Sequence, residues 1–531
     1  MKTTTRLWTR ELVRALTVVT CVMSSYTGAA TFRLQEASIA DVHDAFKMGQ
    51  LTCRHLVQLY LNRIAAYDKQ GPMLNAVQTV NPKALSEADR LDAAYKTSGL
   101  VGPLHCIPVL LKDQVETMEM PTTYGSAVFK DFVPATDATI VTRMKRAGAI
   151  IIGKATMGEF ASRYVGSASG IVRNAYDPSR NASGSSGGTG AGIAANFAIL
   201  GIGEDTGGSI RGPAAVSSLV GLRPTIPVVS RHGMMPATPG SDTLGPITRT
   251  VTDAAILLDV IAGYDANDPV TAQSVGQMPA TYTALLNHDG LKGARIGVIR
   301  EPMDPKANPK SDDYRQVRAV MDKALGDLKT QGAELVDPIV IPRLKDLIKR
   351  VHTDNNFETE PAINAYLARH KNSPAKTFRD IITSGQVVPW RIKGLMDGVG
   401  KSKSDPAYLQ VVLGREELRS SVLKLMADHR LDALVYATFD HNPTLIAPDV
   451  LTNPEPKDDY GLGNNRGLSP ALSFPAVTVP AGFTSEQLPV GIEFLGRPFS
   501  EGTLFKLIYS YEQATRNRKP PARTPPLAGE P

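Results

Sequence analysis

The stretch that organises this chain is NASGSSGGTGAGIAANFAILGIGEDTGGSIRGPAAVSSLVGLRPT, residues 181–225. It holds two glycine–serine clusters, GSSGG at 184–188 and GGS at 207–209, separated by small apolar residues. Consecutive glycines let backbone N–H groups turn towards one point. A serine at that point could attack a carbonyl carbon while the N–H groups hold the developing oxyanion. The stretch therefore predicts the nucleophile of a hydrolase, although either cluster alone is more typical of a flexible turn.

A serine nucleophile needs a base, because its hydroxyl is unreactive until a proton is removed. No histidine lies close in sequence to either cluster, and a histidine brought near by the fold stays open. Lys112, directly after the apolar run 107–111, is the best-placed lysine. Lowering a lysine pKa from about 10.4 to near 7 takes roughly 4–5 kcal/mol, which burial can supply. Taken alone, Lys112 would be read as a solvated residue at a strand end.

The motifs of this stretch, with Lys112 upstream, resemble those of the amidase signature family of serine hydrolases. The resemblance rests on GSSGG at 184–188 and DTGGSIR at 205–211. Further similar motifs lie at 104–108, 153–160, 221–225, 242–246, 473–482 and 488–498. The similarity is good over about 36–263 and 466–515 and poor over 264–465, where much of a substrate pocket would be lined. Cys106 and Ser183 stand where glycine is usual or frequent in the family.

The resemblance implies a role for each residue of the motifs. Lys112 would be the base, Ser185 a relay serine in a cis peptide linkage, and Ser209 the nucleophile that forms an acyl-enzyme. The remaining implied residues are the oxyanion-hole N–H groups of Thr206, Gly207, Gly208 and Ser209, and the supporting residues Ser186, Asp205 and Arg211.

The order of expected elements indicates an α/β protein, since helical patterns alternate with apolar strands. Strands are expected over 107–111, 149–152, 294–299, 476–479 and 490–495, and helices over 190–200, 214–219, 251–262, 313–330 and 503–515. The resemblance implies a three-layer α/β/α sandwich around a large mixed central sheet. We expect one amidase domain over 31–518 and an extended Pro-rich tail over 519–531.

Residues 1–30 have the pattern of a signal peptide. A basic start is followed by an apolar run over 15–23 and by small residues through Ala30, where we expect cleavage. An uncleaved amphipathic N-terminus is the alternative. The apolar run is too short for an ordinary spanning helix, and none follows. The sequence thus predicts an exported, periplasmic or secreted protein with no stable membrane span.

The bulk composition argues against nucleic-acid binding. The 531 residues are 42% hydrophobic and 21% charged, which is typical of a globular protein. Of the formal net charge of +6, +3 falls within residues 1–30, so the rest of the chain is close to neutral for its size. A basic patch of the kind that binds nucleic acid is therefore not expected.

Several short patterns carry less weight. Residues 148–155 match a phosphate-binding loop except at Ala155, and their isoleucines indicate a buried strand. Residues 190–195 fit a dinucleotide fingerprint but follow a loop instead of a strand. Asn181 begins a glycosylation triplet, where a glycan would obstruct the proposed site. The three cysteines predict no disulfide framework and no thiolate metal site, and we expect no metal and no cofactor.

The sequence therefore favours an exported amidase that hydrolyses a small-molecule carboxylic amide to a carboxylate and an amine or ammonia. Two alternatives remain: a transamidation enzyme resembling the A subunit of a glutamine-dependent amidotransferase, and a non-catalytic exported binding protein on the same fold. Aryl, fatty acyl and peptide C-terminal amides are all open as substrates, as are esters. The chain would act as a monomer or a homodimer.

Overall fold

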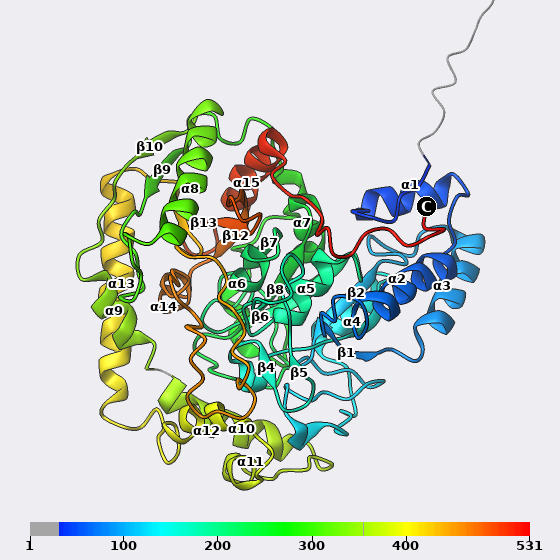
Figure 1. Cartoon of the computed structure of the whole chain (residues 1–531), viewed down its shortest axis with the longest axis horizontal. Coiled ribbons are helices and arrows are strands. Elements are labelled where there is room, and N and C mark those ends of the chain that lie inside the picture. The colour runs from blue at the N-terminus through cyan, green and yellow to red at the C-terminus, as the bar shows by residue number, and fades with distance from the viewer. Residues whose placement is uncertain (1–30, 354) are drawn as a thin grey trace, which may run out of the picture.

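A computed structural model describes residues 31–353 and 355–531, so the predicted signal peptide lies outside the described residues. The chain folds around one mixed sheet of 11 strands, which confirms the predicted α/β class and its large mixed central sheet (Figure 1). In spatial order the strands are β1 (Val77–Val80), β3 (Ile150–Ala155), β2 (Pro108–Lys112), β6 (Leu200–Asp205), β8 (Thr243–Thr248), β7 (Val220–Arg223), β12 (Ala476–Phe483), β13 (Pro489–Leu495), β11 (Ala433–Ala437), β9 (Arg295–Val298) and β10 (Glu334–Val336).

Three neighbouring parallel strands set up the part of the sheet that matters for function. β2 pairs with β3 on one side and with β6 on the other, and Leu111 lies opposite Ile202 in β6. All three strands are buried along their whole length, which explains their nearly continuous apolar sequence. Because parallel strands end at the same edge, Lys112 at the end of β2 comes next to the end of β6.

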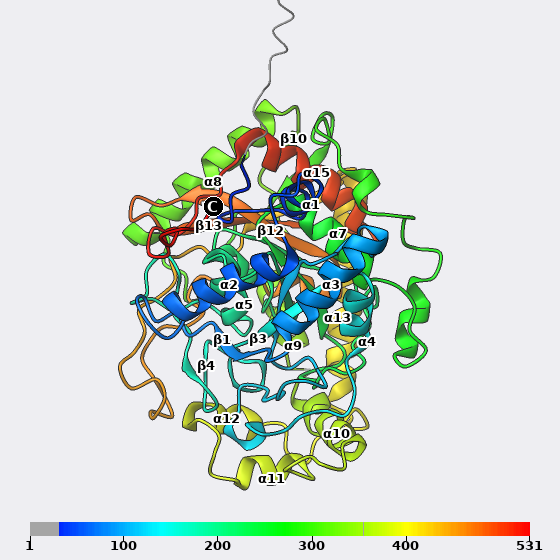
Figure 2. The same cartoon turned by 90° about the vertical axis from the view of Figure 1, so that its right-hand side faces the viewer.

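Helices cover both faces of the sheet (Figures 1 and 2). α5 and α6 pack against each other and against the central strands, while α4, α7, α8 and α15 form a second connected layer. The helices are α1 (Ile39–Lys47), α2 (Cys53–Tyr67), α3 (Ala84–Ser98), α4 (Thr139–Arg146), α5 (Gly187–Ala194), α6 (Arg211–Ala215), α7 (Val251–Ile261), α8 (Asp312–Thr330), α9 (Leu344–Val351), α10 (Asn355–Arg369), α11 (Phe378–Thr383), α12 (Pro389–Met396), α13 (Tyr408–Asp428), α14 (Leu468–Leu472) and α15 (Glu501–Thr515).

The run between the two glycine–serine clusters differs from its prediction. The expected helix over 190–200 is instead α5, which ends at Ala194, followed by a turn and then by β6. Asn196 adopts a left-handed conformation with φ of 59°, which ends the helix. The prediction was wrong because an apolar run is equally typical of a buried helix and of a buried strand.

The glycines of α5 have a packing role. A Cβ at Gly188 would collide with the carbonyl oxygens of Ala76 and Thr156, and one at Gly190 would lie 2.9 Å from Pro213. Only glycine allows α5 to lie this close to the sheet and to α6.

Of the other predicted helices, α6 is displaced, since it covers Arg211–Ala215 instead of 214–219. The helices predicted over 251–262, 313–330 and 503–515 are observed as α7, α8 and α15.

A disulfide bond corrects the expectation from the cysteine count. Cys53 at the start of α2 is bonded to Cys106 in the turn before β2, although 53 positions separate them. Sequence spacing does not show such a pairing, because only the packing of α2 near this turn brings the two thiols together. Cys106 has a φ of 60° and Ser183 has a φ of 57°, which explains why glycine is usual or frequent at these two places in the family.

The region over 264–465 supplies the strands β9, β10 and β11 of the sheet, and its helices α10, α11 and α12 form the lower end of the molecule in Figures 1 and 2. Helices α10, α11 and α12 pack onto the segment that follows β2, where Ile363, Phe378 and Leu395 share an apolar cluster with Tyr124 and Phe160. This cluster joins the three helices to the segment that follows β2.

Two further observations concern the ends and the surface. The tail over 519–531 lies along α2, where Arg63 donates to Thr524 O at 2.7 Å and pairs with Glu530 at 2.8 Å.

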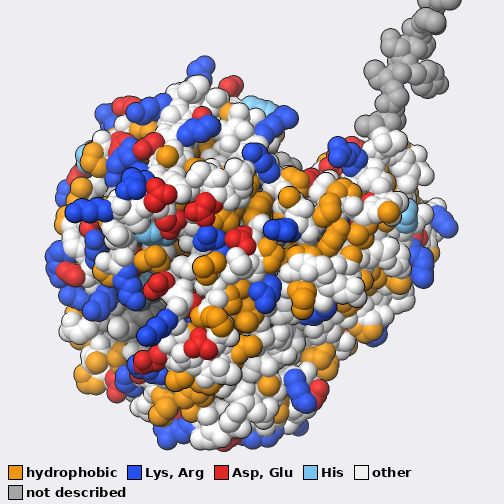
Figure 3. Space-filling view, viewed as in Figure 1, with side chains coloured by type: hydrophobic (Ala, Val, Ile, Leu, Met, Phe, Trp, Pro, Cys, Tyr) orange, Lys and Arg blue, Asp and Glu red, His pale blue; other side chains and the backbone are white. Residues whose placement is uncertain are grey.

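Basic and acidic side chains are interspersed over the face shown in Figure 3. No described helix combines the length and apolarity needed to cross a bilayer.

Candidate active site

Lys112 lies at the centre of the site and is fully buried. Its Nζ lies 2.8 Å from Ser185 Oγ, 2.7 Å from Glu204 Oε2 and 3.1 Å from the backbone oxygen of Glu204. Burial lowers the pKa of Lys112 below its ordinary value, although the nearby Glu204 carboxylate acts in the opposite direction. The structure thus brings Lys112 and Ser185 together, and it adds Glu204, which sequence reasoning missed.

The first glycine–serine cluster is held in place by its backbone. The Gly184–Ser185 peptide bond is cis, as the resemblance implies. Ser186 Oγ donates to Glu204 O at 3.2 Å, and the Ser186 N–H donates to Ser209 O at 3.3 Å. Ser186 therefore ties the first cluster both to β6 and to the second cluster.

Asp205 organises the second cluster. Its carboxylate accepts N–H bonds from Gly208 at 2.7 Å and from Ile210 at 3.1 Å, and it pairs with Arg211 and Arg223. Burial alone would raise the pKa of Asp205, but the two guanidinium groups hold it well below its usual range. Because the Gly208 N–H is bonded to Asp205, it is the least suited of the four predicted oxyanion donors.

Arg466 is a second residue that sequence reasoning missed. Its Nη1 donates to Gly208 O at 2.9 Å and to Gly184 O at 3.4 Å, so one side chain bridges both clusters. The guanidinium also lies 4.5 Å from the ring centroid of Phe439. No motif marks Arg466, since it lies more than 250 positions from either cluster in a segment of ordinary composition.

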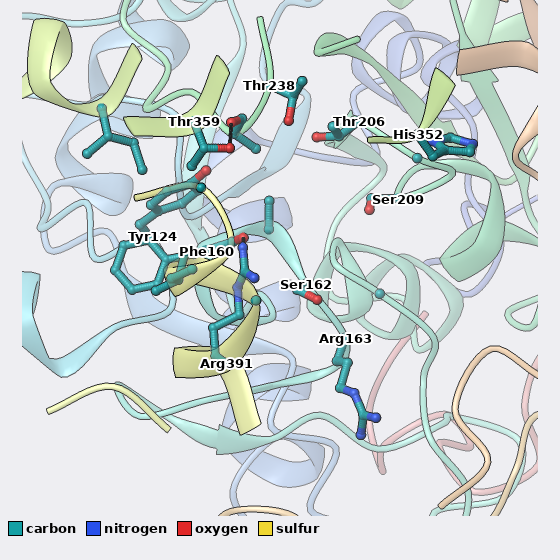
Figure 4. A pocket seen from close by; sticks show the side chains of 18 of the residues that line it. Tyr124, Phe160, Ser162, Arg163, Thr206, Ser209, Thr238, His352, Thr359 and Arg391 are labelled. Atoms are coloured by element: carbon teal, nitrogen blue, oxygen red, sulfur yellow. Dashed lines mark hydrogen bonds between the residues drawn. The ribbon is translucent and has the colours of Figure 1, made fainter. Parts of the chain in front are cut away.

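Ser209 lines a pocket beside these clusters (Figure 4). Thr206, Ser162 and His352 surround the serine, while Tyr124, Phe160, Thr359 and Arg391 lie farther along the pocket. The Tyr124 and Phe160 rings meet edge to face, with 5.1 Å between centroids. His352, Thr359 and Arg391 come from the region over 264–465, which the sequence indicated as pocket lining without naming residues.

Arg391 carries the positive charge on this wall of the pocket. Its Nη2 donates to Phe160 O at 3.0 Å, while its buried Nε has no hydrogen-bond partner among the described residues. Burial lowers the pKa of Arg391, and the neighbouring Tyr124 and Glu159 oppose this only in part. The pocket therefore combines an aromatic surface with a guanidinium group that can bind an oxygen acceptor.

The other patterns from the sequence have structural explanations. Residues 148–155 form the buried strand β3 and the turn before it, not a phosphate-binding loop. Asn181 is buried, and its side-chain amide donates to Thr444 O at 2.9 Å, so the glycosylation triplet is inaccessible in this fold. Within the part of the chain that the structure describes, no group of three His, Cys, Asp or Glu side chains is arranged to hold a metal ion.

The α/β fold thus places a buried Lys112–Ser185 pair beside a pocket that Ser209 lines. The chain belongs to the Amidase family, whose sequence model matches residues 55–505. A protein of Arabidopsis thaliana described as a probable amidase is 32% identical over 93% of both chains. The glutamyl-tRNA(Gln) amidotransferase A subunit of an Exiguobacterium strain is 34% identical over 92% of this chain and 99% of that protein.

Solved structures give the same result. The native peptide amidase of Stenotrophomonas maltophilia superposes with a TM-score of 0.82 and 34% identity, covering 93% of this chain and all of that one. An amidase family protein of Bacillus anthracis gives a TM-score of 0.81 and 33% identity, covering 92% of both chains. The family includes both amidases and amidotransferase subunits, so membership alone leaves the reaction to be argued from the site.

Proposed function

We propose that this protein is an amidase that hydrolyses a carboxylic amide through an acyl-enzyme on Ser209. The observation that carries the proposal is the 2.8 Å contact between the buried Lys112 amine and Ser185 Oγ. Because burial lowers its pKa, Lys112 is more readily neutral, and so available as a base, than an ordinary lysine, and a hydroxyl at hydrogen-bond distance is able to pass a proton to it.

The reaction would proceed in two halves. As the bond between Ser209 Oγ and the carbonyl carbon forms, the Ser209 proton moves to Ser185 Oγ while the Ser185 proton moves to Lys112 Nζ. Backbone N–H groups of Thr206, Gly207 and Ser209 would hold the oxyanion. The same relay, reversed, protonates the leaving nitrogen as the carbon–nitrogen bond breaks. Water then hydrolyses the ester of Ser209 by the same steps.

The first test compares Ser209→Ala with the wild type. Purified protein is offered aryl, fatty acyl and peptide C-terminal amides and a matching ester, and ammonia or amine release is measured. Ser217→Ala is the matched control, because Ser217 is a buried serine away from the pocket whose hydroxyl has no hydrogen-bond partner among the described residues. We expect the control to be active and Ser209→Ala to be inactive. Full hydrolysis by Ser209→Ala would overturn the assignment.

The pocket supports a preference among amides. An oxygen-bearing group, such as a second carbonyl or a carboxylate, would bind Arg391, while an apolar portion would lie against Tyr124 and Phe160. This preference is tested with paired substrates that differ only in a carboxylate. Arg391→Met should raise KM for the acidic member of each pair and leave the neutral member nearly unchanged.

Export is the second part of the proposal. The pattern of residues 1–30 and the disulfide between Cys53 and Cys106 both support it, since disulfides persist mainly in oxidising compartments. The test is the mass of the protein recovered from each cell fraction. We expect a chain without its first 30 residues and with the two cysteines linked, outside the cytoplasm. A full-length chain with free thiols in the cytoplasm would contradict it.

Transamidation is the second candidate, favoured by the 34% identity to the Exiguobacterium amidotransferase protein. It requires an aminoacylated tRNA together with a companion protein, whereas an amidase works alone. Turnover of simple amides by the purified chain would favour the amidase. Activity only after addition of a partner and charged tRNA would favour the amidotransferase. A binding protein that has lost catalysis would not react with a serine-directed fluorophosphonate.

A further inference from the structure

Glu204 occupies an unusual position, because one residue supplies two of the three oxygens around the Lys112 amine. The backbone oxygen lies 3.1 Å and the side-chain Oε2 lies 2.7 Å from Nζ, and the third oxygen is Ser185 Oγ at 2.8 Å. Glu204 has no exposed side-chain surface, and neither has Lys112. Both contacts are therefore shielded from bulk solvent.

The number of hydrogens on the Lys112 amine decides which of its neighbours the lone pair faces. A lysine ammonium has three N–H donors, whereas a neutral amine has two and a lone pair. When Lys112 is neutral, its two hydrogens can be donated to the two Glu204 oxygens. The lone pair then faces the remaining neighbour, Ser185 Oγ. Glu204 thus aims the basic electron pair at the relay hydroxyl.

A second count concerns the other oxygen of the Glu204 carboxyl group. Thr206 Oγ1 lies 2.6 Å from Glu204 Oε1 and 2.8 Å from Asp242 Oδ1. A hydroxyl has one hydrogen, so it can donate to only one of two carboxylates. The other contact is a hydrogen bond only if that carboxyl group carries a proton. Both contacts of Thr206 can therefore be hydrogen bonds only if one additional proton lies on Glu204 or on Asp242.

The electrostatics of Asp242 agree with this count. Burial, reinforced by the negative charge of Glu204, raises the pKa of Asp242 to about 7. The charged or titratable groups that act on Glu204 or on Asp242 from the surrounding elements are Lys112 on β2, Arg223 on β7 and Tyr124 in the segment after β2, and Asp205 on β6 acts on Lys112.

We propose that Glu204 is a positioning residue for Lys112 and that Glu204 and Asp242, joined by Thr206, share one proton that sets the pH range in which Lys112 acts as a base. The inference rests on the proposed function, since it concerns the same lysine. When Ser185 gives its proton to Lys112, the ammonium forms against the Glu204 carboxylate, and the shared proton is then held on Asp242. The proton that Lys112 receives comes from Ser185, which takes the proton of Ser209, and the same path returns it to the leaving nitrogen.

The test measures the rate at which a fluorophosphonate labels Ser209 as a function of pH, which needs no known substrate. Glu204→Gln keeps the size of the side chain and removes its charge. Without the carboxylate, the Lys112 ammonium is less stable, so the acidic limb of the labelling profile should move to lower pH by about one to three units. The matched control is Glu501→Gln, because Glu501 is also a buried glutamate but accepts a hydrogen bond from Thr225 N outside the site.

A second measurement concerns the shared proton directly and does not depend on activity. At neutral pH, the infrared difference spectrum between wild type and Glu204→Gln, or between wild type and Asp242→Asn, should contain a protonated carboxyl band. The spectrum for Glu501→Gln should lack that shared-proton signal. Only one of the two site variants needs to fold for this measurement, and thermal unfolding of each variant is recorded alongside.

The labelling results distinguish failure of the proposed function from failure of the Glu204 assignment. Failure of the wild type to be labelled overturns the proposed function, and the inference with it. If the wild type is labelled but Glu204→Gln has the same acidic limb, or only a uniformly lower rate at every pH, the inference is overturned while the proposed function stands. A shifted limb together with the carboxyl band supports it.

Discussion

Two buried lysines end neighbouring strands of the sheet, and they have different surroundings. Lys112 ends β2, and Lys154 lies near the end of β3, opposite Leu111 in the parallel register. Both side chains are fully buried, and burial lowers the pKa of both, opposed in each case by a nearby carboxylate. By burial and by pKa direction alone, either lysine could serve as a base.

Their partners separate the two residues. Lys154 donates to Thr122 Oγ1 at 2.8 Å, to Asp113 O at 3.1 Å and to Pro121 O at 3.3 Å. Two of these acceptors are carbonyl oxygens and the third is a threonine hydroxyl. Lys112 also contacts a hydroxyl, but it is that of Ser185, in the cluster that the Ser186 N–H joins to Ser209. Ser209 lines the pocket, whereas Thr122 is not among the residues that line it. The comparison teaches that a buried lysine becomes a candidate base through the groups around it.

The largest expected effect is the loss of Lys112. Lys112→Met should lower the rate of Ser209 labelling and of amide hydrolysis by about 10²–10⁴-fold, the usual contribution of a positioned proton acceptor. The rate is measured per folded molecule, with the folded fraction taken from circular dichroism. Retention of wild-type rates would remove the distinction between the two lysines.

Loss of Lys154 should affect stability instead. In Lys154→Met the buried Asp113 loses its cation, which lies 3.5 Å away in the wild type. Breaking one side of a buried pair typically costs about 3–5 kcal/mol of unfolding free energy. Urea unfolding measures the loss, and the labelling rate per folded molecule should stay close to that of the wild type. A loss of labelling equal to that of Lys112→Met would contradict the comparison.

The two strands also differ at their beginnings, since only β2 follows a disulfide. Replacing both Cys53 and Cys106 by alanine should reduce the unfolding free energy by about 2–4 kcal/mol, because the closed loop spans 53 positions. Glycine in place of Cys106 should be less damaging than alanine, since this residue has a φ of 60°. Chemical denaturation of Cys53→Ala/Cys106→Ala beside Cys53→Ala/Cys106→Gly tests this difference in stability. Equal stabilities would argue against a backbone contribution at Cys106.

The smallest effect is that of pH. A protonated Lys112 is no base, so labelling should rise with pH through the lowered pKa of this lysine and then level off. Below that pKa, the labelling rate should fall about tenfold for each unit by which the pH is lowered. Lys154→Met should show the same acidic limb as the wild type. A limb that moves in Lys154→Met would mean that the two lysines titrate together.

Much of the candidate site could be predicted from local sequence. The motifs at 184–188 and 205–211 named Ser185, Ser209 and Asp205, and the apolar run before Lys112 indicated a strand end. The same reasoning could not identify Glu204 as a contact of Lys112, because 92 positions separate the two residues. Arg466 and Arg391 were missed for the same reason, since each reaches the site from a segment without a recognisable pattern.

The apolar run after Gly190 shows where local reasoning failed on the fold. Its composition is compatible with a helix and with a buried strand, and the sheet decides for β6 because Leu200 pairs with Val109 and Thr248 on either side. The cysteine count likewise gave no pairing, since the Cys53–Cys106 bond depends on where α2 lies.

The sequence by itself determined the chemistry-bearing groups: two glycine–serine clusters, a lysine after a buried strand, and an α/β alternation of elements. These features are local, because backbone freedom and hydrophobic patterning act over a few residues. The tertiary structure alone decided which lysine contacts the Ser185 hydroxyl, which carboxyl group contacts that lysine, and which arginines reach the pocket. Those contacts join distant segments, and their strength depends on burial, which no single stretch of sequence contains.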